Sequence, residues 1–164
     1  MSWLNRRAIL ALPLALAACG FTPAIGPAGP ATALRGTIAL ADTETRDGFE
    51  FIKRMEDRLG RASAPRFDLG YSISTGKASL GFTTDGAITR FNLTGSVTWT
   101  LKDRATGDVL ASGVEQNFTA WSATGVTIAA VNAESDANVR LIRILADQVT
   151  QRLIALSPSL TVAE

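Results

Sequence analysis

The amino-acid sequence predicts an α+β fold, a two-layer sandwich with two helices packed on one face of a four-stranded, mostly antiparallel (mixed) sheet. Two segments, Asp42 to Arg61 and Ala133 to Leu156, repeat apolar residues every three to four positions, which is typical of amphipathic helices. The segments before and between them alternate apolar and polar residues, which favours strands with one covered face. Runs of strands with helices to one side form two layers around one core.

The first residues predict export from the cytoplasm. Two arginines precede an apolar run from Ala8 to Ala17, and Ala18 and Cys19 follow. This is a signal peptide cut before a cysteine, as in bacterial lipoproteins, so we expect cleavage between Ala18 and Cys19 to remove residues 1–18. Cys19 would then carry acyl chains, two or more of which anchor a protein stably. The apolar run is shorter than the roughly 20 residues that span a bilayer.

A lipidated tether and a short strand come next. Residues 19–33 are rich in proline and glycine, which resist helix and sheet formation alike. Apolar residues alternate from Leu34 to Leu40, which predicts a strand with one buried face. We expect a single α+β domain over residues 34–158 and a flexible tail over residues 159–164.

The first helix is predicted to end at Gly60, a residue that favours helix termini. Its apolar stripe consists of Phe49, Ile52, Met55 and Leu59. Arg54, Arg58 and Arg61 share another side and form a modest positive stripe. A solvated helix face is the ordinary explanation of such a stripe, but it would also attract an anionic lipid headgroup.

The central strands differ in how regular they are. Apolar residues change phase between Phe67 and Phe82, which predicts a bulge or turn near Gly76. A tight turn is expected at Thr84-Asp85-Gly86. Arg90 to Leu101 is the clearest strand, with Trp99 on its apolar face and Arg90 on its polar face.

The rest of the chain predicts a turn at Asp103 to Asp108, a strand and a long helix. The strand, Val109 to Trp121, has weakly phased apolar residues, so its register stays open. In the last helix four apolar residues step by four, and Ser157-Pro158 is expected to end it. The four residues are Leu141, Leu145, Val149 and Leu153.

Composition excludes several classes of site. The chain contains no histidine, which removes Ser-His-Asp catalysis and histidine-containing zinc sites, and its 15 acidic residues are scattered. We therefore expect no enzyme activity, metal or cofactor. The 16 basic residues nearly balance the acidic ones, so no basic field is available for nucleic acid. Cys19 is the single cysteine, so the fold must stand without disulfides.

Taken together, these features resemble the LptE family of lipopolysaccharide-assembly lipoproteins. The resemblance rests on the lipobox with Cys19 to Pro23, the strand from Arg90 to Leu101 with its Thr106-Gly107 turn, and the leucine-rich helix through Ala146 to Gln148. It implies a non-enzymatic partner that plugs the outer-membrane β-barrel LptD and is reported in this family to bind lipopolysaccharide. A polar sheet face suits a polar, water-filled lumen.

The residue after the anchor predicts a location on the periplasmic face of the outer membrane, with attachment through the N-terminal lipid. The residue after Cys19 is Gly20 and not aspartate, and this resembles the pattern in lipoproteins that are sorted to the outer membrane. The family's lipopolysaccharide contacts do not map onto particular residues of this chain. Candidate anionic-lipid contacts are therefore taken from its own pattern, with Arg90 first and Arg54, Arg58 and Arg61 after it.

Two other functions are compatible with an anchored two-layer domain. One is an auxiliary lipoprotein of an ABC-type lipid-transport system, whose partner would be an inner-membrane transporter or a tunnel protein. The other is an anchored hydrolase, which would need a convergent catalytic cluster in a pocket. An uncovered sheet face is a natural docking surface, although a solvated face is the default for antiparallel sheets.

Overall fold

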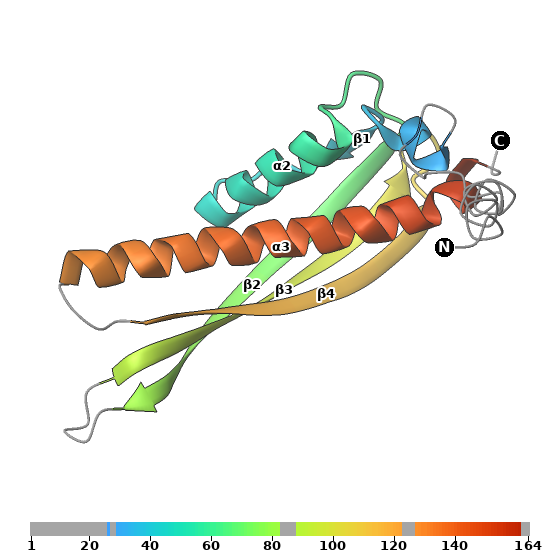
Figure 1. Cartoon of the computed structure of the whole chain (residues 1–164). Helices are drawn as coiled ribbons and strands as arrows, with labels where there is room; N and C mark the ends of the chain where they lie inside the picture. The colour runs from blue at the N-terminus through green and yellow to red at the C-terminus, as the bar shows by residue number, and fades with distance from the viewer. Residues whose placement is uncertain (1–25, 27–28, 83–87, 123–126, 162–164) are drawn as a thin grey trace, which may run out of the picture.

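The computed structural model describes residues 26, 29–82, 88–122 and 127–161 of the chain. In Figure 1, two helices lie on one side of a long twisted sheet. The elements in chain order are η1 (Pro30–Leu34), β1 (Ile38–Leu40), α2 (Arg46–Leu59), β2 (Phe67–Phe82), β3 (Ile88–Asp103), β4 (Val109–Ser122) and α3 (Thr127–Thr161). The predicted signal peptide, Cys19 and the turn predicted at Thr84 to Gly86 lie outside the described residues.

The predicted fold class is confirmed. The four strands lie in the order β1-β2-β3-β4, with β1 parallel to β2 and the other neighbours antiparallel. The mixed sheet arises because α2 carries the chain back before β2 begins, whereas only a few residues separate the later strands in the sequence. Both helices then cover one face and leave the other open.

The core lies between α3 and the middle of the sheet. The four apolar residues of the predicted α3 stripe are fully buried, and so are the β3 residues Val97 and Leu101 beneath them. Gly95 lets the helix approach closely, because a Cβ added there would lie 2.9 Å from Leu141 Cδ2. Trp99 is buried on the same face, as predicted.

Helix α2 begins and ends at residues that cap it. Thr45 Oγ1 accepts the backbone N–H of Gly48 at 3.1 Å, and Gly60 ends the helix with a φ of 78°. The predicted stripe was wrong at its start, since Phe49 is 60% exposed and Phe51 is buried in its place. The Phe51 ring lies 4.6 Å from that of Tyr71, which fastens α2 to β2.

The segment before α2 differs from the prediction. Leu34 does not belong to the first strand but closes the 3-10 helix η1, and it is buried. Pro30 suits the first turn of a helix because its φ is fixed near the helical value. Gly36 then turns the chain with a φ of 71°, so that β1 starts only at Ile38.

Strand β2 continues without a break through Gly76, which pairs with Thr94, so the bulge predicted there was wrong. The register shifts instead fall between Ser79 and Phe82. Because the phase is not corrected earlier, Leu80 stays 59% exposed on the strand.

Helix α3 does not end at Ser157-Pro158 as predicted but continues to Thr161. Proline removes the N–H that would bond to the carbonyl four residues back, which here is Ile154. The Ser157 hydroxyl donates to the Ile154 carbonyl at 2.7 Å and supplies that missing bond. Leu160 in the added turn is buried.

The register of β4, left open by the sequence, is now defined. Glu115, Thr119 and Trp121 face the helices and are buried, whereas Val114 and Phe118 face outward. The inward polar residues bond to α3: Glu115 Oε1 accepts from Arg152 Nε at 3.0 Å, and Thr119 Oγ1 donates to the Ala137 carbonyl at 3.0 Å. These bonds explain why polar residues occupy the covered face.

Candidate functional site on the open face of the sheet

The face of the sheet opposite the helices is the best candidate for a functional surface. Residues with even numbers on β3 and β4 point to it, and most of them are polar. No helix covers this face within the described part of the chain. Several hollows lie on it, and two of them share Phe118 as a lining residue.

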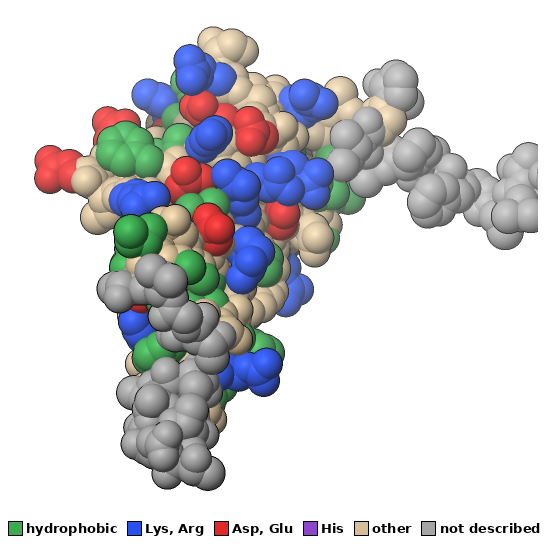
Figure 2. Space-filling view, turned by 60° about the vertical axis from the view of Figure 1, so that its left-hand side comes forward, with side chains coloured by type: hydrophobic (Ala, Val, Ile, Leu, Met, Phe, Trp, Pro, Cys, Tyr) green, Lys and Arg blue, Asp and Glu red, His purple; other side chains and the backbone are tan. Residues whose placement is uncertain are grey.

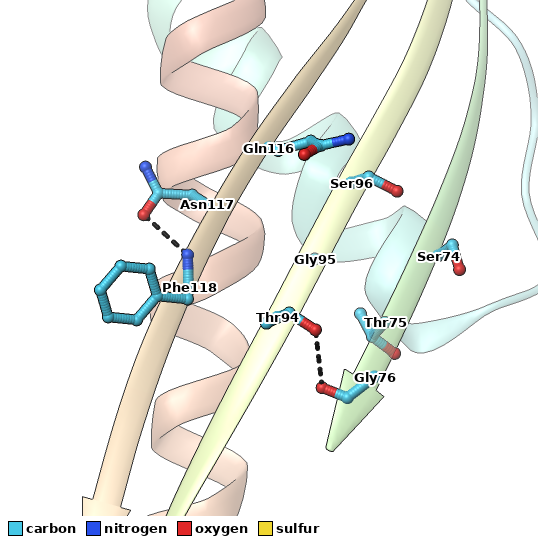
Figure 3. A pocket seen from close by; sticks show the side chains of 9 residues that line it. All are labelled: Ser74, Thr75, Gly76, Thr94, Gly95, Ser96, Gln116, Asn117 and Phe118. Atoms are coloured by element: carbon cyan, nitrogen blue, oxygen red, sulfur yellow. Dashed lines mark hydrogen bonds between the residues drawn. The ribbon is translucent and has the colours of Figure 1, made fainter. Parts of the chain in front are cut away.

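One of these two is a shallow trough of about 510 Å³ across the middle of β2, β3 and β4 (Figure 3). A further hollow of about 670 Å³ lies nearer β1, and Asp68 and Lys102 are among its lining residues. The side chains of the trough form two rows, which the strand register places next to each other. One row is Ser74, Ser96 and Gln116, and the other is Gly76, Thr94 and Phe118. Thr75, Gly95 and Asn117 complete the lining, and no lining residue carries a charge.

Two local contacts shape the trough. The Thr94 hydroxyl donates to the Gly76 carbonyl at 3.2 Å, so it leans over the space left by the missing side chain. At the rim, Asn117 Oδ1 accepts the backbone N–H of Phe118 at 2.8 Å, on the free edge of β4. The Phe118 ring projects from that edge and is 64% exposed.

The second hollow, of about 380 Å³, is lined by the predicted candidate Arg90. Leu80 of β2 and Phe118 of β4 lie on either side of it, and Asn92 and Ala120 are among the other lining residues. Arg90 is exposed, as predicted for the polar face. Because Phe118 lines both hollows, the neutral trough and the cationic hollow are neighbours along the sheet.

The other three predicted arginines lie on the helix side, away from Arg90. Arg54 Nη2 and Arg58 Nε both bond to the carboxylate of Asp147 in α3, at 2.9 and 3.0 Å. This hydrogen bond raises the pKa of Arg54 above its ordinary value. Arg61 bonds to Glu56 at 3.3 Å and remains largely exposed. The stripe is therefore largely neutralised by acidic neighbours.

Charges of both signs are interspersed on the side of the molecule that Figure 2 shows. Among the described residues, no group of three or more acidic, cysteine or histidine side chains is placed to hold a metal ion. In the same part of the chain, no helix combines the length and the apolar character needed to cross a membrane.

The sequence indicated a polar face and Arg90 but not the trough. Phe118 belongs to the weakly phased segment Val109 to Trp121, in which Gln116 and Ala120 on either side of it give no clear alternation. Phe118 is recognisable as part of the trough only from its pairing with Thr94, and this pairing requires the register between β3 and β4.

Comparisons with known proteins agree with this architecture. A lipoprotein of Caulobacter crescentus has 20% identity and a TM-score of 0.67, over 79% of this chain and 96% of that one. Rare lipoprotein B of Shewanella oneidensis has 12% identity and a TM-score of 0.59, over 76% and 97%. A minor lipoprotein of Acinetobacter baumannii has 18% identity and a TM-score of 0.54, over 73% and 89%. At these identities the similarity shows a shared fold.

The family assignment comes from the sequence itself. No curated protein sequence matches the chain. The sequence profile of the LptE family, described as lipopolysaccharide-assembly, matches residues 35–153, which is more than half of the chain and nearly the whole folded domain. The chain therefore belongs to the LptE family of lipopolysaccharide-assembly lipoproteins.

Proposed function

We propose that this protein is a non-enzymatic partner of the outer-membrane β-barrel LptD and acts with it in assembling lipopolysaccharide into the outer membrane. The family match over residues 35–153 carries the proposal. The export signal before Cys19 supports a lipid anchor on the periplasmic face of that membrane. A helix-backed sheet with an open polar face suits docking to a polar surface better than catalysis.

Affinity purification from membranes tests this function directly. The acylated protein should bring down a large β-barrel in equal amount, and its depletion should stop lipopolysaccharide from reaching the cell surface. Recovery of an inner-membrane ABC transporter or a tunnel protein in place of the barrel would favour the auxiliary transport function instead. Recovery of no barrel would contradict the proposal.

The anchor has its own test. Mass spectrometry of the mature protein should find cleavage before Cys19 and acyl chains on that residue. Cys19→Ser should release the protein from the membrane fraction, because the sulfur that carries the lipid is lost. An unmodified Cys19 on an uncleaved chain would contradict membrane attachment by lipid.

Arg90 is the foremost proposed contact for an anionic lipid group. It is exposed on the open face between two large apolar side chains, whereas Arg54 and Arg58 are both engaged by Asp147. Arg90→Ala should weaken lipopolysaccharide binding more than Arg61→Ala, which removes an equally charged residue from the helix side. Equal losses from the two variants would contradict a special role for Arg90.

A further inference from the structure

We propose that the trough over β2, β3 and β4 binds an uncharged oligosaccharide, namely the neutral sugars of the glycolipid that the protein handles. The identity of that glycolipid rests on the proposed function, whereas the neutral-sugar chemistry rests on the trough itself. The trough consists of the rows Ser74-Ser96-Gln116 and Gly76-Thr94-Phe118.

The dimensions of the trough suit a short saccharide. Neighbouring strands lie about 4.8 Å apart, so three strands span roughly 10 Å, and the two rows are roughly 7 Å apart along the strands. The volume of about 510 Å³ lies within the range of small-molecule sites, about 300–1,000 Å³. Gly76 keeps the floor open, because a Cβ there would lie 3.2 Å from Thr94 Oγ1.

The polar groups match sugar hydroxyls. The hydroxyls of Ser74 and Ser96 and the carboxamide of Gln116 each donate and accept hydrogen bonds, as sugar hydroxyls do. No lysine, arginine, aspartate or glutamate lines the trough. A phosphate or carboxylate would lose hydration there without gaining a counter-charge, so the trough favours neutral sugars.

The exposed ring of Phe118 distinguishes this surface from an ordinary solvated sheet face. An aromatic ring has a negative face, and the C–H face of a sugar ring is apolar and weakly positive, so the two stack favourably. Phe118 points away from α3 and makes no contribution to the core, yet it is the largest side chain at the rim. A ligand that covers it would remove exposed apolar area from water.

The location of Arg90 gives the ligand a direction. Arg90 lies on β3 four residues from Thr94, the strand partner of Phe118, which corresponds to roughly 13 Å. A charged portion of the same glycolipid would lie toward Arg90, and its neutral sugars would lie over the trough.

Saturation-transfer NMR with the full acylated chain in detergent micelles tests the proposal. The probe is the uncharged part of the lipopolysaccharide oligosaccharide, released from lipid by mild acid and separated from fragments that carry carboxylate or phosphate. The wild-type protein should transfer saturation to its ring protons. Phe118→Ala, which removes the stacking ring, and Gly76→Thr, which fills the floor, should each weaken the Kd roughly tenfold, about 1.4 kcal/mol.

Val114→Ala is the matched control, because Val114 is 55% exposed on the same strand and face but does not line the trough. It should bind like the wild type. A signal no larger than that from micelles alone, or unchanged binding by Phe118→Ala with its circular dichroism intact, would overturn the proposal.

Co-purification of the β-barrel with each variant separates this inference from the proposed function. If the wild type recovers the barrel but binds no oligosaccharide, the sugar site is wrong and the barrel partnership stands. If it binds the oligosaccharide but recovers no barrel, the sugar site stands and the partnership is wrong. If Phe118→Ala loses the barrel and no oligosaccharide binds, the trough is a protein interface and the sugar proposal is overturned.

Discussion

Trp99 illustrates how closely a single residue packs in the core of this sheet. Its side chain is 3% exposed and lies against the backbone of Gly113 on β4, where an added Cβ would approach the ring to 2.8 Å. A substitution on either side of this contact disturbs a closely packed site. Because side chains alternate along a strand, the inward direction of Trp99 places Thr94 and Ser96 on the open face, which carries the candidate trough.

Trp99→Ala should lower the free energy of unfolding by about 3 to 5 kcal/mol, because it removes a large buried ring and leaves a cavity. Urea denaturation followed by circular dichroism measures the change. Phe118→Ala is the control, since it removes a ring of similar size from the exposed face and should cost far less. A loss of less than about 1 kcal/mol for Trp99→Ala would contradict its position in the core.

Asp103 stabilises the turn between β3 and β4. Its carboxylate accepts the backbone N–H groups of Ala105 and Thr106 at 2.8 and 3.0 Å, and these bonds hold its pKa below the ordinary value. The pKa of Asp103 is lower in the folded than in the unfolded protein, so the ionised carboxylate stabilises the fold. This stabilisation is fully present above the unfolded pKa of about 3.9 and is lost as the pH falls through the folded pKa.

Asp103→Asn should therefore remove part of the decline in unfolding free energy that the wild type shows below about pH 4. Urea denaturation at a series of pH values from about 6 down to about 2 measures both proteins. If the wild type and the variant decline in parallel over the whole range, the turn does not depend on the ionised carboxylate.

At the scale of the elements, the C-terminal end of α3 depends on one hydroxyl. Ser157 donates to the Ile154 carbonyl that Pro158 cannot reach, so Ser157→Ala should cost about 1 to 3 kcal/mol by leaving this carbonyl without its bond. In the double variant Ser157→Ala with Pro158→Ala, the restored backbone N–H should recover most of that loss. Denaturation of the four proteins in this cycle measures the coupling, and strictly additive effects would contradict the compensation.

The same elements show how far the sequence predicts this fold. The strong periodicity of α3 and β3 was sufficient to predict a helix and a strand, because burial of an apolar stripe or of one alternating face determines which structure such a segment adopts. The end of α3 was missed because Pro158 reads as a stop unless the Ser157 bond is known. The trough was missed because it joins residues of three strands, and only the register brings Ser74, Ser96 and Gln116 into one row.

At the scale of the whole molecule, the sheet is covered unevenly. Helix α2 begins at Arg46. A hollow of about 480 Å³ lies at this N-terminal end of α2, between β2 and the first half of α3. The far half of β2, from Gly76 to Leu80, is exposed, whereas Phe67 and Leu69 at the other end are buried. Lys77 holds the far half to α3: its ammonium lies 2.7 Å from Glu134 Oε1 and 4.6 Å from the centre of the Phe91 ring.

This uneven cover predicts two levels of local stability. Amide hydrogens of residues 67–73 and 95–101 should exchange slowly, close to the rate set by global unfolding, because buried side chains cover them. Amides of residues 76–82 should exchange faster. Lys77→Ala should accelerate exchange over residues 76–82 and 90–94 without changing residues 67–73, since it removes the ion pair and the cation–π contact only from the far half.

Hydrogen exchange followed by mass spectrometry measures these rates, with Lys53→Ala on the exposed side of α2 as the control. Uniform protection along β2 would contradict the two levels. Arg90 and the Gly76-Thr94-Phe118 row of the candidate trough lie on the less protected half of the sheet, whereas Ser96 in the other row belongs to the protected segment. A ligand or partner bound there should slow exchange in residues 76–82 most, because a region that opens locally gains the most protection from binding.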